Sequence, residues 1–241
     1  MQELKCWLTT VNTISRNLRM VKFEPEVHLL DKYISAGNTC LHIGAGIGRH
    51  TLIMSRLAGP AGAVYCFEPS VYSYKVLNRA VKFHCLANVR CYKKALADKP
   101  GRETFVTPLK KNRRLGLAFA HLGAGPSAAE EGLREDVEID TVDNFCSREK
   151  IARVDFIRCD VEGAEYRVFR GAEQIIDRCH PTVLAEIHPV ALKNFKSSAE
   201  QVYRFFQARG YRMCYLKDGK LVAAEAVIEE PWRDYFFIHQ P

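Results

Sequence analysis

The feature that most constrains this chain is a run of three alternating glycines, Gly44, Gly46 and Gly48, directly after a short apolar stretch. A helical pattern begins immediately behind the third glycine. This arrangement predicts a buried parallel strand that turns sharply into a helix, because glycine permits a tight turn and a close approach between backbone and ligand. The free N–H groups and the positive dipole end of such a helix attract a carboxylate or a phosphate. The run therefore predicts a cofactor site.

The spacing of the glycines narrows the choice of cofactor. A dinucleotide fingerprint, G-x-G-x-x-G, places its third glycine three residues after the second, and that position is Arg49 here. A phosphate-binding P-loop is excluded because no G-K-[S/T] follows. The observed G-x-G-x-G spacing is better known from sites for S-adenosylmethionine (AdoMet), where the helix start faces the methionine carboxylate. Taken alone, the run is equally compatible with a tight turn that binds nothing.

Glu68 is the second candidate for cofactor binding. It follows a predicted strand over residues 63–67, about 20 residues beyond the glycine run, where an acid accepts both ribose hydroxyls of an adenosine cofactor. The two carboxylate oxygens match a vicinal diol, and their charge disfavours the 2′-phosphate of NADP. The alternative is a solvated acid at the end of a strand. Ser70 is expected to cap the helix that follows.

The remaining pattern alternates strands with helices. Further strands are expected at 39–43, 88–92, 154–160 and 182–188, with helices at 25–37, 51–57, 70–81 and 199–210. Residues 211–216 and 235–239 are expected to close the sheet as antiparallel elements, with a tight turn at Asp218 and Gly219. The chain is therefore predicted to be α/β, with a doubly wound, mostly parallel, seven-stranded Rossmann-like sheet that ends in a C-terminal antiparallel hairpin.

Two regions depart from this alternation. Residues 1–37 are predicted to be a helical lead-in and a candidate substrate lid, before a domain over 38–241. Residues 96–141 are predicted to be an insertion of strands, at 103–107 and 135–142, and of loops. A basic cluster at 110–114 either binds an anionic substrate or belongs to a solvated loop. No aromatic residue interleaves with it, so we expect no nucleic-acid partner.

Composition and cysteine usage set wider bounds. The chain has 241 residues, of which 47% are hydrophobic, and a formal net charge of +7, which permits an anionic acceptor. Its nine cysteines include no C-x-x-C pair, which disfavours a zinc site and indicates reduced thiols. Neither a membrane-spanning run nor a signal peptide is expected. We therefore predict a cytoplasmic protein of undetermined oligomeric state.

Polar residues gather at the predicted carboxyl ends of the strands, where ligands bind in sheets of this kind. Besides the glycine run and Glu68, these residues are Asp160, Glu162, Glu186 and His188. Glu165 is expected to face solvent or to pair with a basic side chain. This convergence is a stronger indication of a site than any single motif.

Several stretches together resemble the FkbM-type methyltransferases, which are AdoMet-dependent enzymes of the class I methyltransferase fold. The run from His42 to Thr51 is similar to the family's D-I-G-A-N-x-G segment ending in Thr or Ser. The stretch D-F-I-R-C-D-V-E-G-A-E, residues 155–165, is close to D-F-I-K-x-D-V-E-G-x-E, and E-I-H at 186–188 also fits. The resemblance covers about residues 38–215 and identifies the domain over 38–241 as FkbM-like. His42 stands where the family usually has an acid, and Arg158 replaces the usual lysine.

The resemblance implies O-methylation of a hydroxyl on a sugar, a polyketide or another small metabolite. Such a hydroxyl reacts after its proton leaves, so a nearby base is expected, and Asp160, His188 and Glu162 are the candidates. Each has a structural alternative: Asp160 orients the cofactor, Glu162 caps a helix, and His188 ends a strand. Cofactor binding is assigned to His42, Gly44, Ala45, Gly46, Ile47, Gly48, Thr51, Glu68, Pro69, Ser70 and Asp160.

A metal-assisted version of this reaction and two other functions stay open. Asp160, Glu186 and His188 could hold a divalent metal that lowers a hydroxyl pKa, although a metal is not favoured. An NAD-dependent oxidoreductase is compatible with the glycine run and Glu68, but no tyrosine has a lysine four residues later. A binding protein that holds AdoMet without turnover is the other, because His42 lacks the charge of the usual acid. The motifs of amino-group and cytosine methylation are absent.

Overall fold

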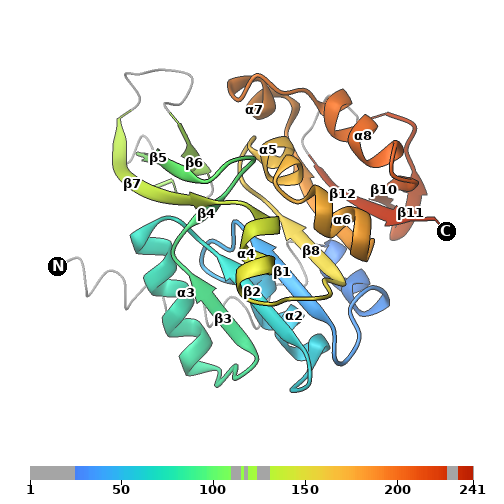
Figure 1. The fold of residues 1–241 in the computed structure, drawn as a ribbon, viewed down its shortest axis with the longest axis horizontal. Helices are drawn as coiled ribbons and strands as arrows, with labels where there is room; N and C mark the ends of the chain where they lie inside the picture. The colour runs from blue at the N-terminus through green and yellow to red at the C-terminus, as the bar shows by residue number, and fades with distance from the viewer. Residues whose placement is uncertain (1–24, 110–114, 117–118, 124–130, 227–232, 241) are drawn as a thin grey trace.

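The computed structural model describes residues 25–109, 115–116, 119–123, 131–226 and 233–240. In this part of the chain one sheet of eight strands forms the centre of the molecule, in the order β11-β10-β12-β9-β8-β1-β2-β3 (Figure 1). The strands are β1 (Thr39–Ile43), β2 (Ala63–Phe67), β3 (Val89–Tyr92), β8 (Phe156–Cys159), β9 (Thr182–Ile187), β10 (Tyr211–Lys217), β11 (Lys220–Ala223) and β12 (Arg233–His239).

The strand directions confirm the predicted doubly wound α/β class. β3, β2, β1, β8 and β9 are parallel, and β12 is antiparallel to both β9 and β10. The expectation of seven strands was wrong by one. The turn at Asp218 and Gly219 closes a hairpin between β10 and β11, and β11 is short and mostly exposed. A strand that buries so little carries no apolar alternation from which to predict it.

Helices cover both faces of the sheet. One face packs on α4 (Val142–Arg148), α5 (Glu165–Arg170), α6 (Glu173–Cys179) and α8 (Ala199–Gln207). The other packs on the 3-10 helix η2 (Pro25–Lys32), α2 (Arg49–Ala58) and α3 (Val71–Phe83). The expected helix at 25–37 is thus 3-10 in form and ends earlier, although Val27, Leu30 and Ile34 are buried as predicted. None of the described helices is long and apolar enough to cross a membrane.

A second sheet occupies the region of the predicted insertion. It contains β4 (Ala95–Leu96), β5 (Gly101–Pro108), β6 (His121–Leu122) and β7 (Gly132–Asp140) in the order β4-β7-β5-β6, and it lies at the upper left of Figure 1. The strand expected at 135–142 therefore ends earlier, and Thr141 caps α4 instead. Residues 1–24 of the candidate lid and the basic cluster at 110–114 lie outside the described residues.

Candidate active site

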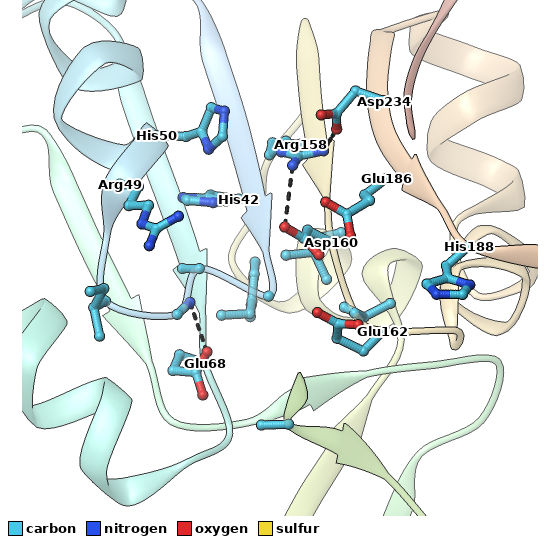
Figure 2. A pocket seen from close by; sticks show the side chains of 18 of the residues that line it. His42, Arg49, His50, Glu68, Arg158, Asp160, Glu162, Glu186, His188 and Asp234 are labelled. Atoms are coloured by element: carbon cyan, nitrogen blue, oxygen red, sulfur yellow. Dashed lines mark hydrogen bonds and ion pairs between the residues drawn. The ribbon is translucent and has the colours of Figure 1, made fainter. Parts of the chain in front are cut away.

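A cavity of about 1000 Å³ lies at the carboxyl ends of β1, β2, β8 and β9 (Figure 2). Its walls come from the glycine turn, η2, the second sheet and the β10–β12 region. Ligand pockets typically measure about 300–1,000 Å³, so this one has room for a cofactor and an acceptor together. Four of the catalytic and metal candidates from the sequence line it: Asp160, Glu162, Glu186 and His188.

Each glycine of the turn has its own structural reason. Gly44 has φ +76°, and a Cβ there would lie 1.7 Å from the carbonyl oxygen of Asp160. A Cβ on Gly48, at φ +89°, would lie 2.7 Å from Leu77. Gly46, at φ +52°, would place a Cβ in open space within the cavity-lining turn. Packing against the backbone of Asp160 thus requires Gly44, the left-handed backbone favours glycine at Gly48, and Gly46 keeps the wall of the cavity free of a side chain.

The backbone of the turn is held to β2. The N–H groups of Gly44 and Ala45 both donate to the carbonyl oxygen of Phe67, at 3.1 and 2.9 Å. The amide of Gly48 donates to the carbonyl of Ala45. These amides are therefore engaged within the protein, and attraction of an anion would have to come from the first turn of α2.

Glu68 lies at the end of β2 and is almost fully buried. Its Oε2 accepts the N–H of Gly46 at 2.8 Å (Figure 2), and its Oε1 accepts the N–H of Ser70 at 2.9 Å. Burial raises its pKa to about 7, although both N–H donors oppose the rise. Each carboxylate oxygen has a second lone pair, so this pair of bonds leaves acceptor capacity for two hydroxyls. Pro69 also lines the cavity, and Ser70 caps α3 as predicted.

His42 is buried at the end of β1, and its Nδ1 lies 2.8 Å from Thr51 Oγ1. Burial lowers the pKa of His42, and the positive charges of His50 and Arg158 lower it further. His42 is therefore neutral, which differs from the charged acid usual at this position in the family it resembles. The ring of His50 lies edge-on to the ring of His42, with 5.9 Å between the ring centroids.

No sequence motif predicted that Glu26 and His50 belong to the site. Both are buried and line the cavity, and Glu26 Oε1 lies 3.5 Å from His50 Nε2. Glu26 comes from the lead-in, far from every motif, and His50 is one residue inside a helix. Only the approach of His50 to His42, and of Glu26 to His50, marks these two residues.

Arg158 joins two strands of the sheet at the cavity. Its Nη1 donates to Asp234 Oδ1 at 2.6 Å and its Nη2 to Asp160 Oδ2 at 3.2 Å. Burial works against its charge, but Asp234, Asp160, Glu186 and Glu26 outweigh burial and raise its pKa. Asp234 is a further residue that the sequence analysis missed, because β12 carries it to the site from the far end of the chain.

Three carboxylates form a cluster beside Arg158. One oxygen each of Asp160, Glu162 and Glu186 lies within 4.8 Å of the others. Burial raises the pKa of Glu162 to about 8 and that of Glu186 to about 9, and the charge of Asp160 adds to both rises. Glu162 also holds a left-handed backbone at φ +55°, which is uncommon for a residue with a side chain. Such strain recurs at functional sites.

His188 lies on the cavity wall but outside this cluster. Its Nδ1 accepts the N–H of Ala191 at 3.4 Å and so caps α7 (Pro189–Asn194). The neutral ring then carries its proton on Nε2. The metal-ligand set predicted from sequence was Asp160, Glu186 and His188. Among the described residues, the group with metal-ligand spacing is instead Asp160, Glu186 and Glu162.

Glu165 does not face solvent, contrary to expectation. It is buried, and its Oε1 accepts the N–H groups of Val161 and Gly163, each at 3.1 Å. Burial raises its pKa to about 7. Glu165 therefore holds the turn between β8 and α5. The sequence analysis gave such a structural role, capping of the helix, as the alternative for Glu162. Glu162 is left to face the cavity.

Comparison with known proteins identifies the family of the chain. Residues 42–213 match the Methyltransferase FkbM domain family. Methyltransferase 1 of Beauveria bassiana is 25% identical over 143 residues, which cover 54% of this chain and 56% of that protein. The chain thus spans little more than half the length of this curated relative.

Two solved structures share the fold. The crystal structure of Methyltransferase FkbM from Methylobacillus flagellatus KT has a TM-score of 0.52 at 11% identity, over 84% of this chain and 44% of that one. A putative rRNA-methylase from Clostridium thermocellum has a TM-score of 0.50 at 9% identity, over 90% and 96%. At such identities the likeness concerns the fold alone. The family match covers most of the chain and includes the glycine turn and the carboxylate cluster, so this protein belongs to the FkbM methyltransferase domain family.

Proposed function

We propose that this protein transfers a methyl group from AdoMet to a hydroxyl oxygen of a small-molecule acceptor. The observation that carries the proposal is a single cavity with two chemically different sides. The glycine turn and Glu68 lie on one side, and Asp160, Glu162 and Glu186 lie on the other (Figure 2). A site that aligns a donor with a hydroxyl and also removes the proton needs both.

The residues present fit AdoMet. Glu68 keeps acceptor capacity for the ribose hydroxyls, and the bare Gly46 leaves space for a ligand against the turn. His42, Ala45, Ile47 and Pro69 line the same wall. When bound, AdoMet supplies a methyl group on a positively charged sulfur. The carboxylate cluster favours a cation nearby, because a positive charge lowers the raised pKa values of Glu162 and Glu186.

Glu162 is the best proton acceptor of the three candidates. Its pKa of about 8 lies near neutral pH, where a general base is most effective. One carboxylate oxygen of Asp160 already accepts a hydrogen bond from the guanidinium of Arg158. His188 uses Nδ1 to cap α7, so its neutral form offers a donor for positioning an acceptor. We therefore assign proton removal to Glu162 and acceptor orientation to Asp160 and His188.

Titration calorimetry with AdoMet and with NAD tests the proposal first. We expect AdoMet to bind and NAD not to bind. A mass-spectrometric screen of hydroxylated acceptors, including anionic sugars, should then show the gain of one methyl group. Binding of NAD alone would support an oxidoreductase instead. Binding of AdoMet without product from any acceptor would support a non-catalytic binding protein.

A metal-assisted version has its own supporting observation, the carboxylate cluster. Three carboxylate oxygens suit a hard divalent cation such as Mg²⁺, which would lower the pKa of the acceptor hydroxyl. Turnover measured after exhaustive chelation and after readdition of Mg²⁺ separates the two versions. Activity that survives chelation would leave proton removal to Glu162 alone.

A further inference from the structure

A buried polar group lies where η2 and α2 cover the carboxyl ends of β1 and β8. His42 and Arg158 are partners in the register of these neighbouring strands. Cys40 and Phe156, two residues earlier in each strand, pack in the core beneath η2 and α2. Side chains two residues apart share a face of a sheet, so His42 and Arg158 also face η2 and α2. Those helices bring Glu26 and His50 to the same place.

Glu26 is the member of this group with unused capacity. Its side chain is buried, and among the described residues its Oε1 accepts no hydrogen bond. His50 Nε2 lies 3.5 Å from this oxygen. Arg158, the neighbouring cation, already donates to Asp160 and Asp234. Because leaving a buried carboxylate oxygen without a donor is costly, Glu26 suits a donor that arrives with a ligand.

The position of Glu26 in the cavity indicates which part of the ligand reaches it. Figure 2 shows Glu68 on one side of the glycine turn and His42 and His50 on the other. If Glu68 binds the ribose, the amino-acid part of AdoMet would lie on the His42 side of the turn. That part carries an ammonium group, which has three N–H donors and a positive charge. The wall formed by Phe105, Phe119 and Leu122 offers no side-chain acceptor for it.

We infer that Glu26 binds the α-ammonium group of the methionine part of AdoMet, and that His50 positions the carboxylate of Glu26. The inference rests on the proposed function. Glu26, which lies in a segment before β1, supplies the negative charge that neutral His42 lacks. It also gives η2 a function besides packing, because the residue that closes this end of the cavity contacts the cofactor.

The test compares two nucleosides that differ in the amino-acid part. S-adenosylhomocysteine has the ammonium group, and 5′-methylthioadenosine lacks the amino-acid part altogether. Glu26→Gln should weaken binding of S-adenosylhomocysteine about tenfold to a hundredfold, as expected for the loss of a charge-assisted hydrogen bond. Binding of 5′-methylthioadenosine should not change. Asp31→Asn, the same chemical change at an exposed residue of η2, should affect neither ligand.

Calorimetry on the full chain distinguishes the outcomes. Unchanged binding of S-adenosylhomocysteine in Glu26→Gln, or equal weakening of both nucleosides, would overturn the inference and leave the proposed function standing. Absence of S-adenosylhomocysteine binding to the wild-type protein would overturn the proposed function and the inference together. Glu26→Asp keeps the charge and controls for misfolding. It should retain most of the affinity, and loss of both ligands in this variant would show a purely structural role.

Discussion

Replacement of Arg158 tests how the site is held together. This side chain belongs to β8, is buried, and bridges Asp160, directly after β8, to Asp234 on β12. Arg158→Met replaces the arginine by a long apolar side chain and leaves both aspartates without their cation. Arg158→Lys keeps the charge, but a single ammonium group replaces the planar fork and cannot reproduce both contacts. The two variants therefore separate loss of charge from loss of geometry.

The structure sets the magnitude. Removing one partner of a buried ion pair costs about 3–5 kcal/mol of unfolding free energy. The side chains of Asp234 and Asp160 are 17% and 31% exposed, so water stabilises part of their charge. We therefore expect the lower end, about 3 kcal/mol, for Arg158→Met. Arg158→Lys loses one charge-assisted hydrogen bond and should cost about 2 kcal/mol.

Urea unfolding followed by circular dichroism measures both changes. With a slope of about 3 kcal/mol per molar urea for a chain of this size, Arg158→Met should lower the midpoint by about 1 M. Arg102→Met is the control, because the side chains of Arg102 and Asp136 are 63% and 64% exposed, and such pairs contribute about 0–1 kcal/mol. A midpoint for Arg158→Met equal to that of Arg102→Met would refute the reasoning. So would equal loss in Arg158→Lys and Arg158→Met.

Three further predictions concern the turn, the buried acids and the base. Gly44→Ala should destabilise the fold far more than Gly37→Ala, since both have positive φ but only the first meets the backbone of Asp160; thermal melts that coincide would contradict this. Burial raises the pKa of four glutamates above 4.5: to about 7 for Glu68 and Glu165, about 8 for Glu162 and about 9 for Glu186. The folded protein therefore binds more protons than the unfolded chain between these values. As a result, these groups reduce the free energy of unfolding as pH rises from about 4.5 to 9. A wild-type unfolding midpoint that does not fall over this range would count against these shifts, and a midpoint that falls as steeply in Glu68→Gln as in wild type would count against the shift of Glu68. Glu162→Gln should abolish turnover while S-adenosylhomocysteine still binds, and wild-type turnover should increase with pH around 8; an active variant with the same pH profile would remove Glu162 as the base.

Much of the fold was readable from local sequence signals. The apolar runs of β1, β2, β8 and β9 and the helices between them follow from short-range periodicity. The turn at the end of β1 follows from the glycines, because the positive φ values at Gly44 and Gly48 exclude most other residues. The same regularity predicted Glu68 and the carboxylates near the strand ends, since parallel strands present their carboxyl ends at one edge.

The tertiary structure alone decided which of these residues meet. Glu26 and Asp234 reach the site from opposite ends of the described chain, and no local pattern marks either. Glu165 and Glu162 are three residues apart with similar surroundings in sequence, yet one holds the backbone turn and the other faces the cavity, because a left-handed backbone at Glu162 redirects its side chain. Local sequence fixes which elements form; the contacts between distant elements, and the burial that shifts the pKa values of their charged groups, exist only once the chain has packed.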